Sequence, residues 1–282
     1  MKRCVGWTMA ALILALPSVR VEAAGKMSLW DLAADTEVSL EQVAPRLAGA
    51  DLVFVGEQHD LPSHHQGQLQ VIKALHATGK PVAVGLEMFQ RKNREILDRW
   101  VAGKIDEKEF VARFQENWGD NWPLYRDIFL YCRAQQIPMI GLNVPKEITS
   151  QVAREGFGSL NKEQIGMLPL VTCRVDPEYL ALMRSVHGHG GRGEEAFTHF
   201  CEAQLVWDTA MAVYSLEYLK TNPNHTLVVL AGSVHAWKKG IPAQVRKENP
   251  ETKQLIILPS TPGGFSKDNA STADGDFLLL GL

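Results

Sequence analysis

The sequence predicts an α/β fold with a mostly parallel central sheet, flanking helices and a helical cap or insertion. Continuous apolar runs, such as 52–55 and 226–231, are typical of strands that helices cover on both faces of a parallel sheet. Segments with helical spacing lie between these runs, which is the order that βαβ units require. The chain has 282 residues, 45% of them apolar, and this is enough for one large domain of that class.

The first 24 residues (1–24) are typical of a cleavable signal peptide. Lys2 and Arg3 precede an apolar run, and small residues near Ala23 suit a cleavage site. The run is too short for a spanning helix, which weighs against the alternative of a retained membrane anchor. Cys4 lies before the run, whereas a lipoprotein signal needs its Cys just after it. We therefore expect export to a periplasm without a lipid anchor.

The first part of the α/β core is predicted over residues 25–145. It opens with a lead-in in which Ser39 caps a short helix, 40–47, ahead of the first strand, 52–55. The elements expected next are a helix over 66–77, a strand over 82–86, helices over 90–101, 107–116 and 123–136, and a strand over 137–142.

A helical cap is predicted over residues 146–200, because the strand pattern lapses there. Three helical pieces and a Gly-rich loop, 187–193, make up this segment. The core resumes over 201–282 with a long helix, 195–219, whose apolar stripe is read as packing rather than as a cofactor site. The remaining expected elements are strands over 226–231 and 255–258, a helix over 239–246 and an edge strand over 277–280.

Five polar residues come just after apolar strand-like runs: Glu57, His59, Glu87, Asn143 and His235. In open α/β sheets the functional crevice lies outside the carboxyl ends of the strands. We therefore expect these side chains to gather along one edge of the sheet. This expectation depends on the parallel pairing of the strands.

Two histidines in the pattern Gly-x-x-His, His59 and His235, suit either a divalent metal or acid–base chemistry on a polar substrate. The predicted metal ligands are His59, Glu87 and His235, and the predicted catalytic set adds Glu57. The alternative is that each imidazole only binds backbone groups at a strand end. For Glu87 the alternative is a structural ion pair with Arg91 or Lys92.

Asn143 also has a simpler interpretation, as a turn residue that starts the next helix.

Three residues of the predicted cap are candidates for haem binding: Tyr179, His187 and His189. A tyrosine phenolate ligates ferric haem in some proteins, and histidines can bind iron or contact the propionates. Plain packing of Tyr179 and a mobile loop around the two histidines are the alternatives.

Several classes of protein are disfavoured. The formal charge of −3 shows no basic excess, so nucleic acid is not an expected partner. There is no Gly-x-Gly-x-x-Gly after a strand, no P-loop and no Gly-x-Ser-x-Gly. Cys132, Cys173 and Cys201 are too few and odd in number for a disulfide framework, although one pair is possible, and the absence of a Cys-x-x-Cys spacing argues against a thiolate zinc site.

Six segments resemble the ChaN-like haem-binding uptake family of the Tiki superfamily, and they occur in the same order over most of the chain after residue 24. The resemblance implies an α/β fold and a role in haem uptake. It also implies haem held as a cofacial pair between two subunits, each iron bound by a tyrosine. The segments are 52–60 (LVFVGEQHD), 85–89 (GLEMF), 121–125 (NWPLY), 141–145 (GLNVP), 204–212 (QLVWDTAMA) and 231–235 (AGSVH).

The resemblance implies haem as the ligand, a homodimer, and haem-transport components of the outer or inner membrane as further partners. The wider superfamily contains metal-dependent proteases and erythromycin-esterase-like enzymes, whose paired Gly-x-x-His and Glu resemble His59, His235 and Glu87. Two functions are therefore expected to compete. One is an exported haem-binding protein, and the other is a metal-dependent hydrolase acting on a peptide or an ester.

Overall fold

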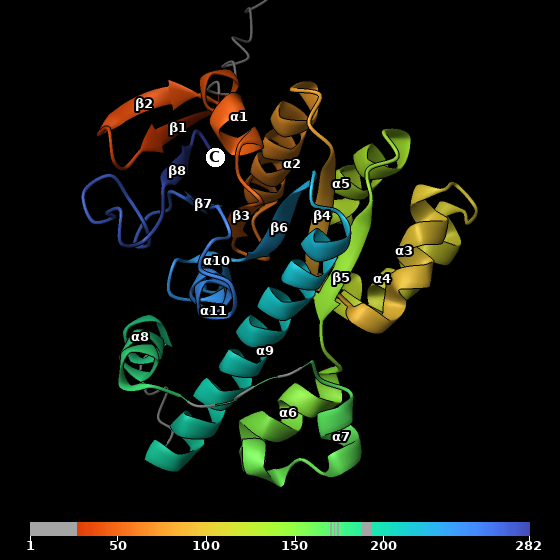
Figure 1. The fold of residues 1–282 in the computed structure, drawn as a ribbon, viewed down its shortest axis with the longest axis vertical. Helices are drawn as coiled ribbons and strands as arrows, with labels where there is room; N and C mark the ends of the chain where they lie inside the picture. Colours follow the sequence, from red (N-terminus) through yellow and green to blue (C-terminus); the bar gives the residue numbers. More distant parts are fainter. Residues whose placement is uncertain (1–26, 170, 172, 174, 188–192) are drawn as a thin grey trace, which may run out of the picture.

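The computed structural model describes residues 27–169, 171, 173, 175–187 and 193–282, which form one sheet of eight strands with helices on both faces (Figure 1). This confirms the predicted α/β class with its mostly parallel sheet. The predicted signal peptide, 1–24, lies outside the described residues. Within the described part, no helix combines the length and the apolar character needed to cross a membrane.

The sheet has the strand order β2-β1-β8-β7-β3-β6-β4-β5. All neighbours from β8 to β5 are parallel, whereas β1 is antiparallel to both β2 and β8. The strands are β1 (Ser28–Asp31), β2 (Thr36–Ser39), β3 (Leu52–Glu57), β4 (Val82–Gln90), β5 (Met139–Asn143), β6 (Thr226–Gly232), β7 (Gln254–Pro259) and β8 (Phe277–Leu280).

The prediction of β8 as an edge strand is wrong, because β1 and β2 extend the sheet beyond it. These two strands were not predicted. Each has only four residues, and half of β2 is exposed, so neither carries a long apolar run. β1 is held in the sheet by pairing with β8, near the other end of the chain. A local sequence pattern does not show a contact between such distant segments.

The helices follow the predicted order. Ser39 begins the first of them with a capping box, in which its side chain and that of Gln42 bond each other's backbone amides. The helices are α1 (Leu40–Ala48), α2 (Pro62–Ala77), α3 (Arg94–Val101), α4 (Glu107–Trp118), α5 (Trp122–Ala134), α6 (Lys146–Glu155), α7 (Lys162–Gly166), α8 (Pro177–His187), α9 (Glu194–Thr221), α10 (Ser233–Ala236) and α11 (Ile241–Glu248), with short 3₁₀ turns at Arg91–Asn93, Gly119–Asn121 and Phe157–Ser159.

Strand β3 shows why its sequence is a continuous apolar run. Val53 and Val55 belong to the core on the face covered by α1 to α5, while Leu52 and Phe54 belong to the core beneath α9 and α11. Because alternate side chains point to opposite faces and helices cover both, every position from 52 to 55 is apolar. Figure 1 shows the second half of α9 crossing one face of the sheet.

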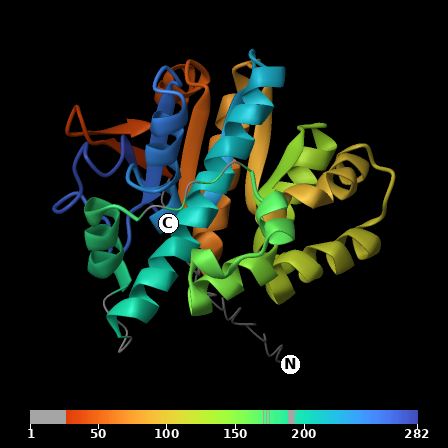
Figure 2. The same ribbon diagram turned by 60° about the horizontal axis from the view of Figure 1, so that its bottom comes forward.

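The segment predicted as a cap, 146–200, contains α6, α7, α8 and the start of α9. Ile148 and Val152 of α6 pack against Ala203 of α9, and Tyr179 and Met183 of α8 pack in a separate cluster with other α9 residues. These helices lie on either side of the first half of α9, beyond the carboxyl ends of the parallel strands (Figures 1 and 2). α9 therefore joins the cap to the sheet as one continuous rod.

Candidate functional site

The carboxyl ends of the parallel strands place the predicted residues at one edge of the sheet. Glu57 is the last residue of β3, Glu87 lies within β4, and Asn143 ends β5. His59 lies two residues beyond β3, and His235 lies in α10, the single turn that follows β6. All five line one cavity of about 1140 Å³, so the structure brings them together as expected.

Glu57, His59 and Glu87 form the tightest group, because one potential ligand atom from each lies within 4.8 Å of the others. His235 extends this group: its Nε2 is 3.7 Å from Oε1 of Glu87. The other oxygen of Glu87 accepts a hydrogen bond of 2.7 Å from the amide of Gly232. A Cβ at Gly232 would lie 3.2 Å from the His59 ring, so glycine allows this strand end to approach the imidazole.

Glu57 is fully buried and only half satisfied. Its Oε1 accepts a hydrogen bond of 3.1 Å from the Tyr125 hydroxyl and also contacts Nδ1 of His59. Its Oε2 has no hydrogen-bond partner among the described residues, since Nε2 of His65 is 3.9 Å away. A buried carboxylate oxygen without a partner is costly, so this atom is suited to a cation in the cavity.

Asp208 completes the site from α9, and it was not among the residues predicted from the sequence. Its Oδ1 is 2.6 Å from Nδ1 of His235, and its Oδ2 accepts a hydrogen bond of 2.7 Å from the Tyr179 hydroxyl. The signal that could have revealed it is an acidic residue within the apolar stretch of a long helix. Such a residue is buried only when it has partners.

The alternatives for Glu87 and Asn143 have different outcomes. The alternative for Glu87, an ion pair with Arg91, does not form, because Arg91 instead lies 3.7 Å from Oε2 of Glu217. Asn143 does serve the turn: its Oδ1 accepts a hydrogen bond of 2.8 Å from the amide of Val144. Its Nδ2 also donates to the backbone oxygen of Glu87 at 2.7 Å, which ties the ends of β4 and β5 together.

Burial and the carboxylates of the site shift the pKa values of His235, His59 and Tyr179. Burial lowers the pKa of His235, but the carboxylates of Asp208 and Glu87 raise it to about 9 overall. Burial also lowers the pKa of His59, which Glu57 and Glu87 raise above its usual value. Burial and the nearby Asp208 carboxylate hold the pKa of Tyr179 well above its usual value. The carboxylates therefore favour the protonated form of both imidazoles.

The titration of His235 should make the stability of the metal-free protein depend on pH. The pKa of His235 in the folded protein, about 9, exceeds its usual value of 6.5, so the folded state binds this proton more tightly than the unfolded state. Its contribution, about 1–3 kcal/mol, is complete below pH 6.5 and disappears as the pH rises through about 9. Urea unfolding of wild type and His235→Asn between pH 6 and about 10 measures this contribution. The free energies of unfolding of the two proteins should converge as the pH rises. A difference between them that stays constant with pH would contradict the prediction.

Two tryptophans form the walls of the cavity. Trp118, at the end of α4, meets the His59 ring edge-on with ring centres 5.0 Å apart. Trp207, on α9, meets the His235 ring at 5.9 Å in the same manner. Lys146, at the start of α6, also lines the cavity. The site thus combines imidazoles and carboxylates with flat apolar walls and a cation.

The candidate haem residues of the cap are less fully described. Tyr179 is only 5% exposed, and its hydroxyl group is bound to Asp208. His187 is the last residue of α8, and its side chain lies outside the description. His189 lies outside the described residues. Their role in binding haem stays a prediction.

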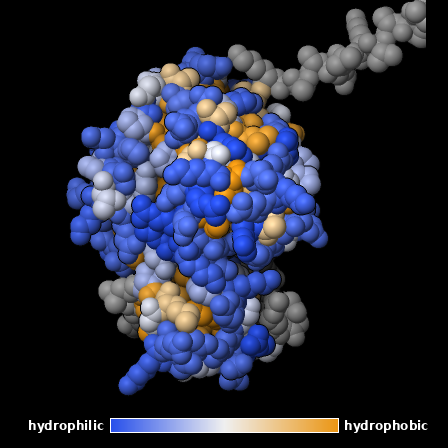
Figure 3. All heavy atoms as spheres, turned by 90° about the vertical axis from the view of Figure 1, so that its right-hand side faces the viewer, coloured by the Kyte–Doolittle hydropathy of each residue, from blue (hydrophilic) through white to orange (hydrophobic). Residues whose placement is uncertain are grey.

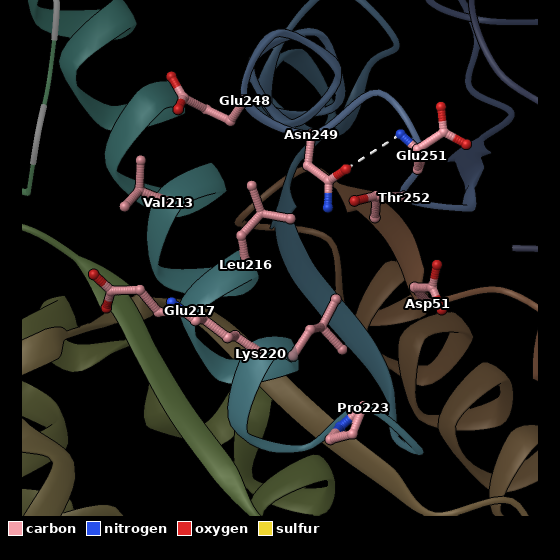
Figure 4. Close-up of a pocket in the computed structure, with 11 residues that line it drawn as sticks. Asp51, Val213, Leu216, Glu217, Lys220, Pro223, Glu248, Asn249, Glu251 and Thr252 are labelled. Atoms are coloured by element: carbon pink, nitrogen blue, oxygen red, sulfur yellow. Dashed lines mark hydrogen bonds between the residues drawn. The ribbon is translucent and has the colours of Figure 1, made fainter.

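A second cavity, of about 550 Å³, lies near the opposite edge of the sheet, where Asp51 precedes β3 and Thr252 precedes β7 (Figure 4). Glu217 lines it from α9, and the side chain of Asn249 accepts a hydrogen bond of 3.2 Å from the amide of Glu251. None of the described residues that were predicted to be functional lines this cavity. The predicted chemistry therefore belongs to the cavity at the carboxyl ends of the strands.

Comparison with known proteins relates the chain to one family and to solved structures of similar fold. The family model described as haem-binding uptake, Tiki superfamily, ChaN matches residues 43–245. Among solved structures, that of ChaN from Campylobacter jejuni with cofacially bound haem is 21% identical, with a TM-score of 0.73 over 91% of this chain and 97% of that one. A mutant of the erythromycin esterase EreC in its open conformation is 14% identical, with a TM-score of 0.50 over 78% and 72% of the two chains.

Among curated proteins, the chain is similar to the chloroplastic protein RETICULATA-RELATED 5 of Arabidopsis thaliana, with 20% identity over 260 residues. The match includes 84% of this chain but only 35% of that protein, so the chain spans about a third of the length of the relative. At these identities the structural likenesses establish the fold.

Proposed function

Because the chain belongs to the haem-binding uptake family of the Tiki superfamily that includes ChaN, we propose that it is a periplasmic haem-binding protein that acts in haem or iron uptake. The observation that carries this proposal is the family match over residues 43–245. Haem is the cargo of such a protein, so binding and release matter more than turnover. The export of the chain and its partners among membrane haem-transport components are part of the proposal.

The residues of the site fit the needs of haem. Haem requires an oxygen, nitrogen or sulfur ligand for iron, apolar contact for its faces and polar contact for its propionates. The cavity offers His59 and His235 as nitrogen donors, Trp118 and Trp207 as flat walls, and Lys146 as a cation. Tyr179 lies next to this set through Asp208 and His235.

The apolar surface of the cap supports the proposed homodimer. Ile165 and Met167, near the end of α7, expose 47% and 48% of their surface. Figure 3 shows apolar side chains gathered on the lower part of the face drawn there, apart from those on the main body. A second copy that covered these side chains would bring two caps together, as a haem site shared between two subunits requires. Light scattering with and without haemin tests this, and a monomer under both conditions would contradict it.

Tyr179 is the proposed iron ligand, and replacing it tests the assignment. Ligation requires the Tyr179 hydroxyl to give its proton to Asp208, the carboxylate to which it is hydrogen-bonded, and the phenolate oxygen then to turn to the iron. We expect Tyr179→Phe to shift or weaken the Soret band of the haemin complex, whereas Tyr214→Phe, which changes a tyrosine on α9 instead of α8, should leave the band unchanged. Absorption spectra of the three complexes at equal haemin concentration provide the measurement. Identical spectra for wild type and Tyr179→Phe would remove Tyr179 as the ligand.

A second candidate function is the metal-dependent hydrolysis of a peptide or an ester. The observation that favours it is the unpartnered Oε2 of Glu57 within the group of Glu57, His59 and Glu87. A divalent ion bound there would lower the pKa of a bound water and provide a nucleophile. Among the residues of the chain, the predicted ligands His59, Glu87 and His235 would hold the ion, and the unpartnered Oε2 of Glu57 would add a further oxygen ligand. Haem binding and this site can coexist, since a site can persist on a fold that serves another function.

A further inference from the structure

The carboxylate of Asp208 is one of the most deeply buried charged groups that the structure describes, with 1% of its surface exposed. Both of its oxygens are bound, one to Nδ1 of His235 at 2.6 Å and the other to the Tyr179 hydroxyl at 2.7 Å. These three side chains come from α9, α10 and α8, so the bonds connect the cap, the long helix and the end of β6. The two hydrogen bonds of Asp208 therefore hold α8, α9 and α10 in a fixed relation to one another.

The contact with Asp208 determines which nitrogen of His235 is available. Nδ1 is occupied by the carboxylate, so Nε2 is the nitrogen that faces Glu87, at 3.7 Å from Oε1. Rotation of the ring would exchange the two nitrogens and break the bond to Asp208. The edge of Trp207, with ring centres 5.9 Å apart, further limits the ring. A carboxylate bound to the far nitrogen of a ligand histidine commonly fixes its tautomer and its orientation.

We propose that Asp208 is a positioning residue, which holds His235 with Nε2 directed at Glu87 and the cavity, and that Tyr179 holds Asp208 in turn. The inference rests on the second candidate function, in which His235 binds a divalent ion. It names two residues that do not touch the ion and act only through His235. It also gives Tyr179 a role in the haem-free protein that ends if its hydroxyl moves to iron.

The bonds around Asp208 could instead only stabilise the fold, and this alternative makes a different prediction. A purely structural carboxylate would lower the melting temperature when replaced, but it would leave the affinity for a cation and the proton of His235 unchanged in the folded fraction. A positioning carboxylate changes both. The test therefore needs a binding measurement and a spectroscopic one on protein that is shown to be folded.

The variants are Asp208→Asn, which keeps the size of the side chain, and Tyr179→Phe, which removes only one hydroxyl group. Glu217→Gln is the matched control, since it neutralises an exposed carboxylate on the same helix. Calorimetric titration with Zn²⁺ or Mn²⁺ should show an affinity lower by about 10–100-fold for Asp208→Asn, a smaller loss for Tyr179→Phe, and no change for Glu217→Gln. Circular dichroism and melting temperature confirm that each variant is folded.

Proton NMR of the metal-free protein provides the second measurement. Wild type should show a far-downfield, slowly exchanging Nδ1 proton that His235→Asn removes, and Asp208→Asn should shift or lose this signal. If the signal depends on Asp208 but wild type binds neither cation, the positioning of His235 stands and the metal-dependent function fails. If the signal is the same in folded Asp208→Asn, or if wild type and that variant bind the cation equally, the proposal is overturned.

Discussion

Replacing Glu57 with Gln is expected to abolish the binding of divalent cations, lowering the affinity by more than about 100-fold, without unfolding the protein. Glu57 is fully buried, and its Oε2 has no partner among the described residues. Such an atom costs free energy in the absence of a cation and contributes directly when one is bound. The metal-free variant should therefore be at least as stable as wild type, because a strained functional site is often stabilised when its charge is removed.

Thermal unfolding with and without Zn²⁺ or Mn²⁺ measures both halves of this prediction. Wild type should gain stability with increasing cation concentration, since a ligand that binds only the folded state raises the melting temperature. Glu57→Gln should lose that increase in melting temperature. Glu217→Gln should retain it, because Glu217 is an exposed residue that pairs with Arg91 outside the site. A Glu57→Gln protein that responds to the cation as wild type does would show that Glu57 is not a ligand and would weaken the hydrolase candidate.

Replacing Phe114 with Ala is expected to produce the largest loss of stability, about 3–5 kcal/mol. Phe114 lies in a fully buried aromatic cluster, with ring centres 5.3 Å from Trp122 and 5.6 Å from Phe129. The melting temperature should fall by about 6–20 °C, given roughly 2–4 °C per kcal/mol for a chain of this size. Because α4 carries both Phe114 and Trp118, the wall beside His59 should loosen as well.

Calorimetry of Phe114→Ala against Ile165→Ala provides the comparison. Ile165 is 47% exposed, so its truncation should change stability by no more than about 0.5 kcal/mol. Equal melting temperatures for the two variants would contradict the assignment of this cluster as the core beneath the site.

The sequence was sufficient for the features that depend on local pattern. The apolar run of β3 predicted a strand covered on both faces, and the residues after it predicted Glu57 and His59 at the edge of the sheet. Parallel pairing then brought Glu87 and His235 to the same place, because β4 and β6 are neighbours in the sheet. These inferences needed only strand direction and the position of a residue along its strand.

The features that were not predicted from the sequence depend on contacts between distant segments. Asp208 lies 27 residues from His235 along the chain, and Tyr125 lies 68 residues from Glu57. No periodicity connects such pairs. The short strands β1 and β2 were missed for a similar reason, since their place is fixed by β8 at the other end of the chain. The spacing of Glu87 and Arg91 allowed an ion pair that does not form. Spacing alone does not show that the Glu87 side chain points to Gly232 and His235.

Equilibrium titration of the purified, metal-stripped wild type with haemin, followed in the Soret region, tests the central claim most directly. Saturable binding with about one haem per chain, together with a change from monomer to dimer on size exclusion, is the predicted result. A signal that rises in proportion to haemin without saturation, as free haemin does, would contradict the proposed haem-binding function.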